Sequence, residues 1–347
     1  MAWGTPSRER RVLKAGHSSI AVTLPKPWAE AMNLRPGDLV VFDQNDDGTL
    51  FLKPAPVPGV TPIGAPFLVQ ARAFDTPGVL ERLIVGAYRV GHDAIEVRAD
   101  VPLAPERVEE VLQAARGLLG VSVVAQESNR MVLQSFIDPS KYGLPQLVQR
   151  MKMILIAFLE EMETALQRQA RSRRLSLLEE EASKVLALLV RQLFLASRDW
   201  ALARRIGSPD PRQLLEWRVV VHALEELAQL FGETLSTLND ESGKFPAGTR
   251  DALAGYLAEV KGHLKAVVEA LMHPSLDHAC EVYHQSGIFG NALSVASLKG
   301  YAGGKGLAAR STARLLQRGA GSLSLLAELA IDRAVAARAD TMLVGAA

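Results

Sequence analysis

The hydrophobic positions near the N-terminus alternate with small or polar ones, the pattern of a half-buried β-strand. Ile20, Val22 and Leu24 follow this period of two, and the two prolines of "PKP" then end the strand. The stretch "PWAEAMN" is long enough for about two helical turns. "LVVFD" and "TLFLKP" predict two more strands, joined through an "NDDG" turn. With the opening strand "RRVLKA", the pattern predicts a β-β-α-β-β unit over residues 1–55.

Prolines, and then alternating strand and helix signals, mark the next part of the chain. Residues 56–65 are rich in proline, which is typical of an extended linker. Beyond them "FLVQARA", "AIEVRA", "VSVVAQ" and "RMVLQSFI" predict strands, while "TPGVLERLIVGAYRVG" and "APERVEEVLQAARGLLG" predict helices that stop at Gly91 and Gly120. Residues 66–138 should therefore form a small α/β domain.

From Lys141 onward the apolar period changes to that of helices. One stripe, with steps of three or four, contains Leu147, Met151, Ile154, Phe158, Met162 and Leu166. Helix breaks are expected at "RQARSRR" and "GSPDPR", so residues 140–240 should form a three-helix bundle. A similar pattern predicts a second bundle over residues 244–340. The expected fold is multidomain: a small N-terminal β unit, an α/β domain and all-α tandem three-helix bundles.

The overall charge gives the chain no general attraction to nucleic acid or membranes, but one segment is strongly basic. The chain has 39 Lys+Arg and 38 Asp+Glu. Between residues 7 and 26, five cations face a single carboxylate, Glu9, so this segment has a net charge of +4. The candidate DNA-binding residues are Arg8, Arg10, Arg11, Lys14, Ser18 and Lys26. The charge of this segment alone is equally compatible with a solvated basic edge whose role is only to discourage aggregation.

Targeting and redox signals are weak. The N-terminal "MAWGTPSRERR" lacks the apolar core of a signal peptide, and no apolar run is long enough to span a bilayer. Cys280 is the single cysteine, which excludes an internal disulfide. We expect a cytoplasmic protein.

The N-terminal motifs "SS.AVTLPK.W", "L.PGD.V" and "G.L.L.P" resemble the AbrB/SpoVT swapped-hairpin DNA-binding domain over roughly residues 7–54. In that family two chains interleave their hairpins into one small barrel, and the basic strands and loops face DNA. The resemblance implies a homodimer with DNA as its partner. The same fold also serves antitoxins and protein-protein dimerisation. A unit of this size buries little core by itself, which favours the dimer on physical grounds as well.

The two predicted bundles, together with "RLIVGAYRVGHDAIEVRA" and "LLVRQL", resemble archaeal PhoU-like phosphate uptake regulators that carry an N-terminal AbrB domain. This resemblance covers nearly the whole chain and implies a role in phosphate transport or phosphate-responsive signalling.

The acidic motifs of that family are incomplete in this chain. PhoU proteins can bind metal clusters through carboxylates four residues apart, which share one helix face. Here Glu179 is followed by Ser183 and Glu225 by Gln229, and the matching stretch "LQRGAGSLSLL" of the second bundle has no carboxylate. We therefore expect no metal and no other cofactor, and interpret residues 179–181 as a solvated acidic face.

Other chemistry-bearing residues give weaker signals. The set His273, His278, Cys280 and His284 contains zinc-ligand types, but no paired C-x-x-C is present. Scattered surface histidines and a buried thiol are the favoured interpretation. "GYAGGKGLAARS" differs from a phosphate-binding loop because Gly306 follows Lys305, and we interpret it as a bend.

A second basic stretch, "QRQARSRR", contains Arg168, Arg171, Arg173 and Arg174. It fits contacts to DNA or to a transporter, but a structural role at a helix C-terminus is favoured. No nucleophile, general base or paired-acid motif can be assembled, so no catalytic residue is assigned and we do not expect an enzyme.

Two functional hypotheses follow. In the first, the protein is a dimeric DNA-binding regulator of phosphate uptake. In the second, it does not bind DNA: the N-terminal unit only dimerises, and the bundles dock on a phosphate transporter ATPase or a sensor kinase.

Overall fold

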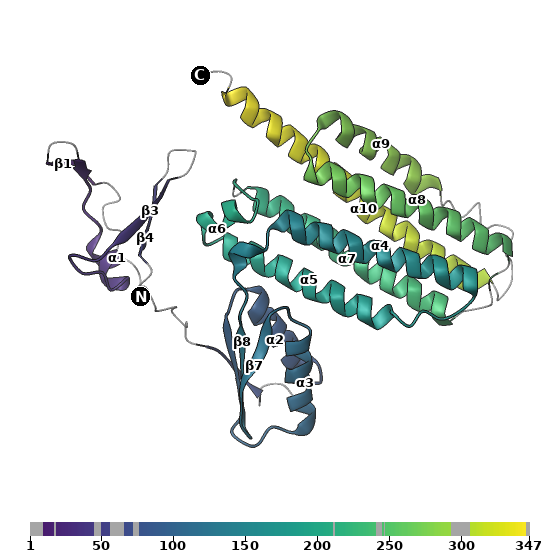
Figure 1. The fold of residues 1–347 in the computed structure, drawn as a ribbon, viewed down its shortest axis with the longest axis horizontal. Helices are drawn as coiled ribbons and strands as arrows, with labels where there is room; N and C mark the ends of the chain where they lie inside the picture. Colours follow the sequence, from purple (N-terminus) through teal and green to yellow (C-terminus); the bar gives the residue numbers. More distant parts are fainter. Residues whose placement is uncertain are drawn as a thin grey trace. The chain divides into compact units, whose positions relative to one another are not determined.

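A computed structural model describes most of the chain, in two compact units, Met1–Pro62 and Ile63–Ala347 (Figure 1). The residues described are 10–16, 19–44, 50–55, 66–71, 76–210, 212–240, 245, 247–292 and 306–344. Within them, no helix is both long and apolar enough to cross a membrane.

The first unit consists of two hairpins joined through a short helix, as the sequence predicts. Strands β1 (Leu13–Ala15) and β2 (Ser19–Ala21) pair antiparallel, and so do β3 (Val40–Gln44) and β4 (Leu50–Pro54). Helix α1 (Lys26–Ala31) follows Pro25 and has a proline in its first turn, where the missing N–H is not needed. The predicted "NDDG" turn lies outside the described residues.

The described residues of this unit form no buried core. None of its described side chains is buried, and its two hairpins form separate two-stranded sheets. Large apolar side chains that are at least 40% exposed are Val12, Leu13, Ile20, Val22, Leu24, Met32, Leu39, Phe42 and Leu50. Isolated two-stranded hairpins are marginal in water, so this unit needs a partner surface. The interleaved barrel stays a prediction because it requires a second chain.

The second unit begins with a four-stranded sheet whose elements have the predicted types and order. They are β5 (Phe67–Gln70), α2 (Val79–Arg89), β6 (Ala94–Arg98), α3 (Pro105–Arg116), β7 (Val121–Gln126) and β8 (Arg130–Ser135). The strand order is β5-β6-β8-β7, with β5 parallel to β6 and both other pairs antiparallel. Helix α2 makes the crossover between the two parallel strands.

Helices α2 and α3 pack on one face of this sheet. Their apolar side chains, including Ile84 and Val111, share a core with Val69, Ile95 and Met131 of the strands. The predicted stop of the second helix at Gly120 was wrong, because α3 already ends at Arg116 with Gly117 as its cap. Gly91, just past the end of α2, and Gly120, before β7, both have a left-handed backbone, with φ of 101° and 65°. This conformation favours glycine because it has no Cβ.

The rest of the chain is mostly helical. Its described helices are α4 (Leu144–Arg168), α5 (Leu175–Ala196), α6 (Trp200–Arg205), α7 (Gln213–Asp240), α8 (Ala247–Met272), α9 (Leu276–Ala292) and α10 (Gly306–Val344), preceded by the short 3₁₀ turn η2 (Pro139–Lys141). The break at "RQARSRR" is confirmed. Helix α6 was not predicted; the side chain of Asp199 caps it by accepting from the backbone N–H groups of Ala201 and Leu202.

The long helices share one hydrophobic core, which runs from Leu144 to Ala334. Helix α10 packs on α7, α8 and α9, and α4 packs on α7 and α8, so the first and second sets of three helices are in direct contact (Figure 1). The apolar periodicity predicted the long helices but did not predict that they share one core, because a hydrophobic stripe does not specify which helix it packs against.

Helix α5 joins the sheet part to the helices. The Arg191 side chain is only 2% exposed. Its guanidinium donates to the Tyr88 carbonyl at 2.6 Å and the His92 carbonyl at 3.0 Å, and pairs with the Asp93 carboxylate. The neighbouring Gln192 amide donates to the carbonyls of Pro139 and Tyr142, at 2.6 and 2.5 Å. The sheet part and the helical part are therefore connected by buried polar contacts.

Candidate functional site

The described candidate DNA-binding residues lie on and next to the first hairpin and at the start of α1. Arg10 and Arg11 precede β1, Lys14 lies within it opposite Ile20, and Lys26 begins α1. All four side chains are exposed. Arg8 and Ser18 lie outside the described residues.

The register of the hairpin places Lys14 directly opposite Ile20, so these two side chains share one face. Side chains alternate along a strand, so Lys14 points to the face opposite that of Leu13 and Ala15. Lys26 pairs with Glu30 at 3.8 Å, but the two side chains are 85% and 66% exposed. An ion pair this exposed contributes little and leaves the lysine available for a phosphate.

Comparison with known proteins places this unit in a class. The model of the MazE family, described as "Antidote-toxin recognition MazE, bacterial antitoxin", matches residues 13–59, which include β1 to β4. The chain thus begins with a small β unit of the MazE/AbrB type and continues with an α/β sheet and a large helical region. No curated protein and no solved structure matches the chain.

The incomplete acidic motifs come together in the structure, with an arginine that sequence reasoning missed. Glu179 of α5 and Glu225 of α7 line one cavity with Arg89, the last residue of α2. The Arg89 guanidinium lies 3.5 Å from the Glu225 carboxylate. Within the described part of the chain, no group of three His, Cys, Asp or Glu side chains is arranged to hold a metal ion.

The two other carboxylates of the expected acidic face have ordinary surface partners. Glu180 pairs with Lys184 one turn along α5, and Glu181 lies 3.7 Å from Arg150 of α4. Hydrogen bonding and charge from Lys184 lower the pKa of Glu180. Of the acidic stretch, Glu179 alone lines the cavity with Arg89.

The histidine and cysteine set does not converge on one point among the described residues. His273 pairs with Glu269 at 3.0 Å, and His278 lines a separate cavity with Lys152 and Lys265. Cys280 is exposed, so the expectation of a buried thiol was wrong. Cys280 lies on the solvent-exposed face of α9, and the sequence pattern did not indicate which face of this helix is buried.

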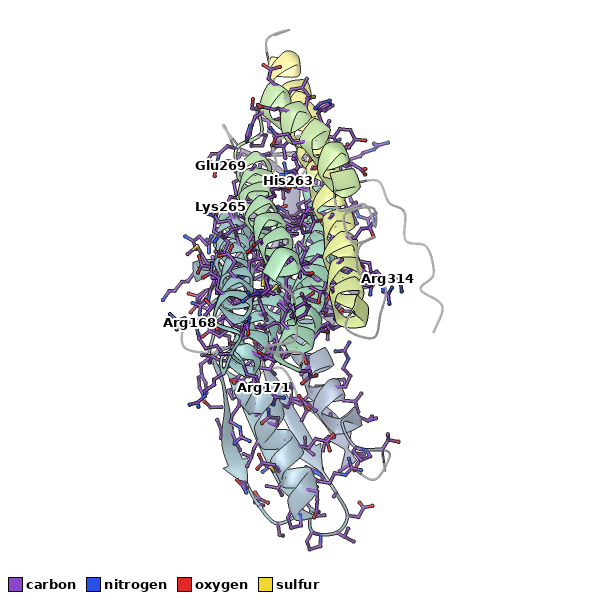
Figure 2. The ribbon with its side chains drawn as sticks, turned by 90° about the vertical axis from the view of Figure 1, so that its right-hand side faces the viewer. Arg168, Arg171, His263, Lys265, Glu269 and Arg314 are labelled. Carbon is purple, nitrogen blue, oxygen red and sulfur yellow. The ribbon has the colours of Figure 1, made fainter. Side chains whose placement is uncertain are left out.

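The second basic stretch, of which Figure 2 labels Arg168 and Arg171, makes structural contacts. Arg171 donates to the Asn239 carbonyl near the end of α7 at 3.0 Å, and Arg174 pairs with Glu161 of α4 at 2.9 Å. These contacts fix the turn between α4 and α5, in agreement with the favoured structural role. Arg168 and Arg173 are exposed.

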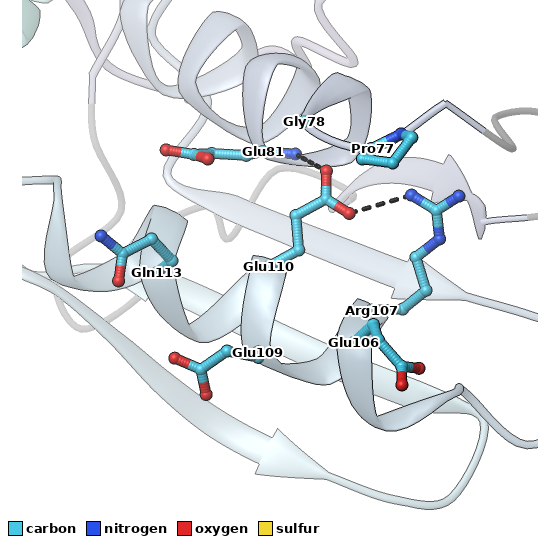
Figure 3. A pocket seen from close by; sticks show the side chains of 8 residues that line it. All are labelled: Pro77, Gly78, Glu81, Glu106, Arg107, Glu109, Glu110 and Gln113. Carbon is cyan, nitrogen blue, oxygen red and sulfur yellow. Dashed lines mark hydrogen bonds and ion pairs between the residues drawn. The ribbon is translucent and has the colours of Figure 1, made fainter.

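A larger cavity, of about 550 Å³, lies between the start of α2 and α3. Figure 3 shows Glu110 inside it, accepting from the Glu81 N–H at 3.2 Å and from Arg107 at 2.9 Å. Burial acts to raise the pKa of Glu110, but these hydrogen bonds lower it overall. This half-buried carboxylate already has its partners, and its hydrogen bonds connect the start of α2 to α3.

Proposed function

We propose that the protein is a homodimeric, DNA-binding regulator that contacts DNA through its N-terminal unit. The match of residues 13–59 to the MazE family carries this proposal. It is supported by the exposed apolar side chains of the unit, which a second copy would cover.

Charge supports DNA as the partner of this unit. Two copies would double the net +4 of residues 7–26, whereas the whole chain has a net charge of only +1. Binding to DNA releases condensed counterions, so the affinity would fall steeply with salt. If each protomer neutralises about three phosphates, the log-log slope against salt is about −5.

The helical region would supply the regulatory part, and we assign it to phosphate uptake on its resemblance to the PhoU-like regulators. Two consecutive sets of three long helices are consistent with that resemblance. The regulator proposed here has no catalytic step of its own. A phosphate transporter ATPase or a sensor kinase is the kind of protein on which the helices would dock.

Mobility shifts with the native promoter and with random DNA test the DNA-binding function. Arg10→Ala/Arg11→Ala removes four charged contacts per dimer, so binding near physiological salt should weaken by at least about 100-fold and the salt slope should become shallower. The matched control is Arg168→Ala/Arg173→Ala, which removes two exposed arginines from the helical region and should bind as wild type. Equal binding by the wild type and by Arg10→Ala/Arg11→Ala would refute the proposal.

The second candidate is an interaction protein that does not bind DNA. The description of the matched family favours it, because that description names recognition of a toxin protein. A folded dimer that shifts neither promoter nor random DNA, but is retained by a phosphate transporter ATPase or a sensor kinase, would establish this alternative.

A further inference from the structure

A cavity of about 270 Å³ lies where the last turn of α2 meets α5 and α7. Its polar lining comes from Arg89 of α2, Glu179 and Ser183 of α5, and Glu225 and Gln229 of α7. Phe158 of α4, which is fully buried, gives it an apolar floor. A few polar groups over an apolar floor are typical of small-molecule sites, although this volume is below the roughly 300–1,000 Å³ of drug-sized pockets.

The Arg89 guanidinium has unused hydrogen-bonding capacity. The Nε atom of Arg89 is buried and has no hydrogen-bond partner in the described structure. Its contact with Glu225 is 3.5 Å, longer than the usual range of about 2.7–3.2 Å. A buried donor without an acceptor costs free energy, which a ligand with an acceptor group would recover.

The second carboxylate, that of the exposed Glu179, lies close to the backbone of α7 at Gly232. A Cβ atom at Gly232 would lie 3.0 Å from the Glu179 Oε1 atom, so the absence of a side chain leaves room for this carboxylate. The site therefore presents one guanidinium and two carboxylates, with the exposed Ser183 and Gln229 at its edge.

These opposite charges select the class of ligand. A phosphate ion would meet two carboxylates, and a divalent cation or a polyamine would meet the guanidinium. A zwitterion satisfies both signs: its carboxylate can take two parallel hydrogen bonds from Arg89, and its ammonium group can lie between Glu179 and Glu225. We propose that this cavity binds a small zwitterionic molecule of the α-amino acid class.

The position of the site gives the ligand a regulatory role. Arg89 belongs to the helix that covers the sheet, whereas both carboxylates belong to the helical part. A ligand held by both would stabilise their packing, and ligand binding to the folded state raises the thermal midpoint. Binding of this ligand requires neither DNA binding by the first unit nor a role of the protein in phosphate uptake.

The test uses the full-length protein and thermal unfolding. Each common amino acid is added at about 10 mM, next to sodium phosphate, magnesium chloride and spermidine at the same concentration. We expect at least one amino acid to raise the midpoint in a saturable way, and calorimetry then gives its Kd. Failure of every amino acid to bind overturns the proposal, and so does binding of phosphate, magnesium or spermidine in their place.

Variants assign the binding to this cavity. Ser183→Leu fills the cavity from an exposed position that makes no hydrogen bond within the described structure, so the fold should be kept while affinity falls at least about tenfold. Arg89→Gln should weaken binding as strongly. Arg150→Gln, which changes an exposed arginine of α4 outside the cavity, should bind as wild type. Unchanged affinity in folded Ser183→Leu would overturn the proposal.

Discussion

At the scale of single residues, buried polar side chains join the helices at defined points. His263 of α8 is 7% exposed, and its Nε2 atom lies 2.6 Å from the Oγ of Ser286 on α9. The Ser286 hydroxyl donates to the Val282 carbonyl at 3.0 Å. In the tautomer with Nε2–H, the ring donates to that hydroxyl. Burial lowers the pKa of His263, so the folded protein favours the neutral ring.

This environment predicts a loss of stability in acid. The unfolded His263 takes up a proton near pH 6.5, while the folded one resists it, so its contribution is complete above that pH and falls below it. Between pH 7 and 5 the free energy of unfolding should fall more steeply in wild type than in His263→Gln, by at most about 1.4 kcal/mol per pH unit.

Urea unfolding at several pH values gives the measurement. The control is His222→Gln on α7, because the His222 side chain is exposed and its removal should leave the wild-type pH profile. If His263→Gln has the same profile as wild type, burial of this ring does not contribute to the pH dependence.

At the scale of elements, the sequence predicted all six elements of the sheet part and the end of α2 at Gly91. Glycine, proline and the period of apolar residues are signals that a short stretch of sequence contains in full. The sequence did not indicate α6, because a cap by Asp199 on a six-residue helix leaves almost no periodic signal. It also missed which helices meet, because α10 packs on α7 across a long separation in sequence.

Two glycines of the same α/β part should respond in opposite ways to alanine. Gly91 has φ of 101°, and a Cβ there would lie 2.8 Å from the Leu195 Cδ2 atom, so Gly91→Ala should destabilise by about 1–3 kcal/mol. Gly86 lies inside α2 with nothing within 4 Å of the Cβ position. Gly86→Ala should therefore stabilise by up to about 1 kcal/mol.

Denaturant unfolding of the two variants at one pH compares them directly. Equal effects of both substitutions would show that neither the backbone conformation nor the contact with Leu195 matters at this helix end.

At the scale of the whole molecule, the two units differ in how they can be stable. The second unit has its own extensive core, whereas the first has no buried side chain among its described residues. The candidate cavity depends on the fold of the whole second unit, because its residues Arg89 and Glu225 are 136 positions apart in the sequence. Sequence reasoning could name Glu179 and Glu225 only because the family resemblance implies an acidic motif at their positions, and nothing local to Arg89 indicates its partner.

The first unit should hold two chains together. Ile20 and Leu39 are 78% and 77% exposed in the single chain, so charges placed there should disrupt a dimer that covers them. Light scattering should give wild type about twice the chain mass of 37.5 kDa, and Ile20→Glu/Leu39→Glu the mass of one chain.

The matched control is Leu215→Glu, at a side chain that is 75% exposed in the helical region. It should stay dimeric. A wild-type protein with the mass of a single chain at micromolar concentration would contradict the predicted dimer.

The hydrogen bonds made by Arg191 and Gln192 restrict the sequence more strongly at the donor positions than at the acceptor positions. Four of their five acceptors are main-chain carbonyls, at Tyr88, His92, Pro139 and Tyr142. Every amino acid supplies a carbonyl, so His92 and Pro139 can change in identity and still offer the same acceptors. Tyr88 is different, because it is a fully buried residue of α2 whose ring centroid lies 4.7 Å from the Arg191 guanidinium carbon. The donors can come only from a guanidinium and an amide of the right length. We therefore expect sequence variation at this junction to be restricted at the two adjacent α5 positions and at Tyr88, and to be tolerated at His92 and Pro139.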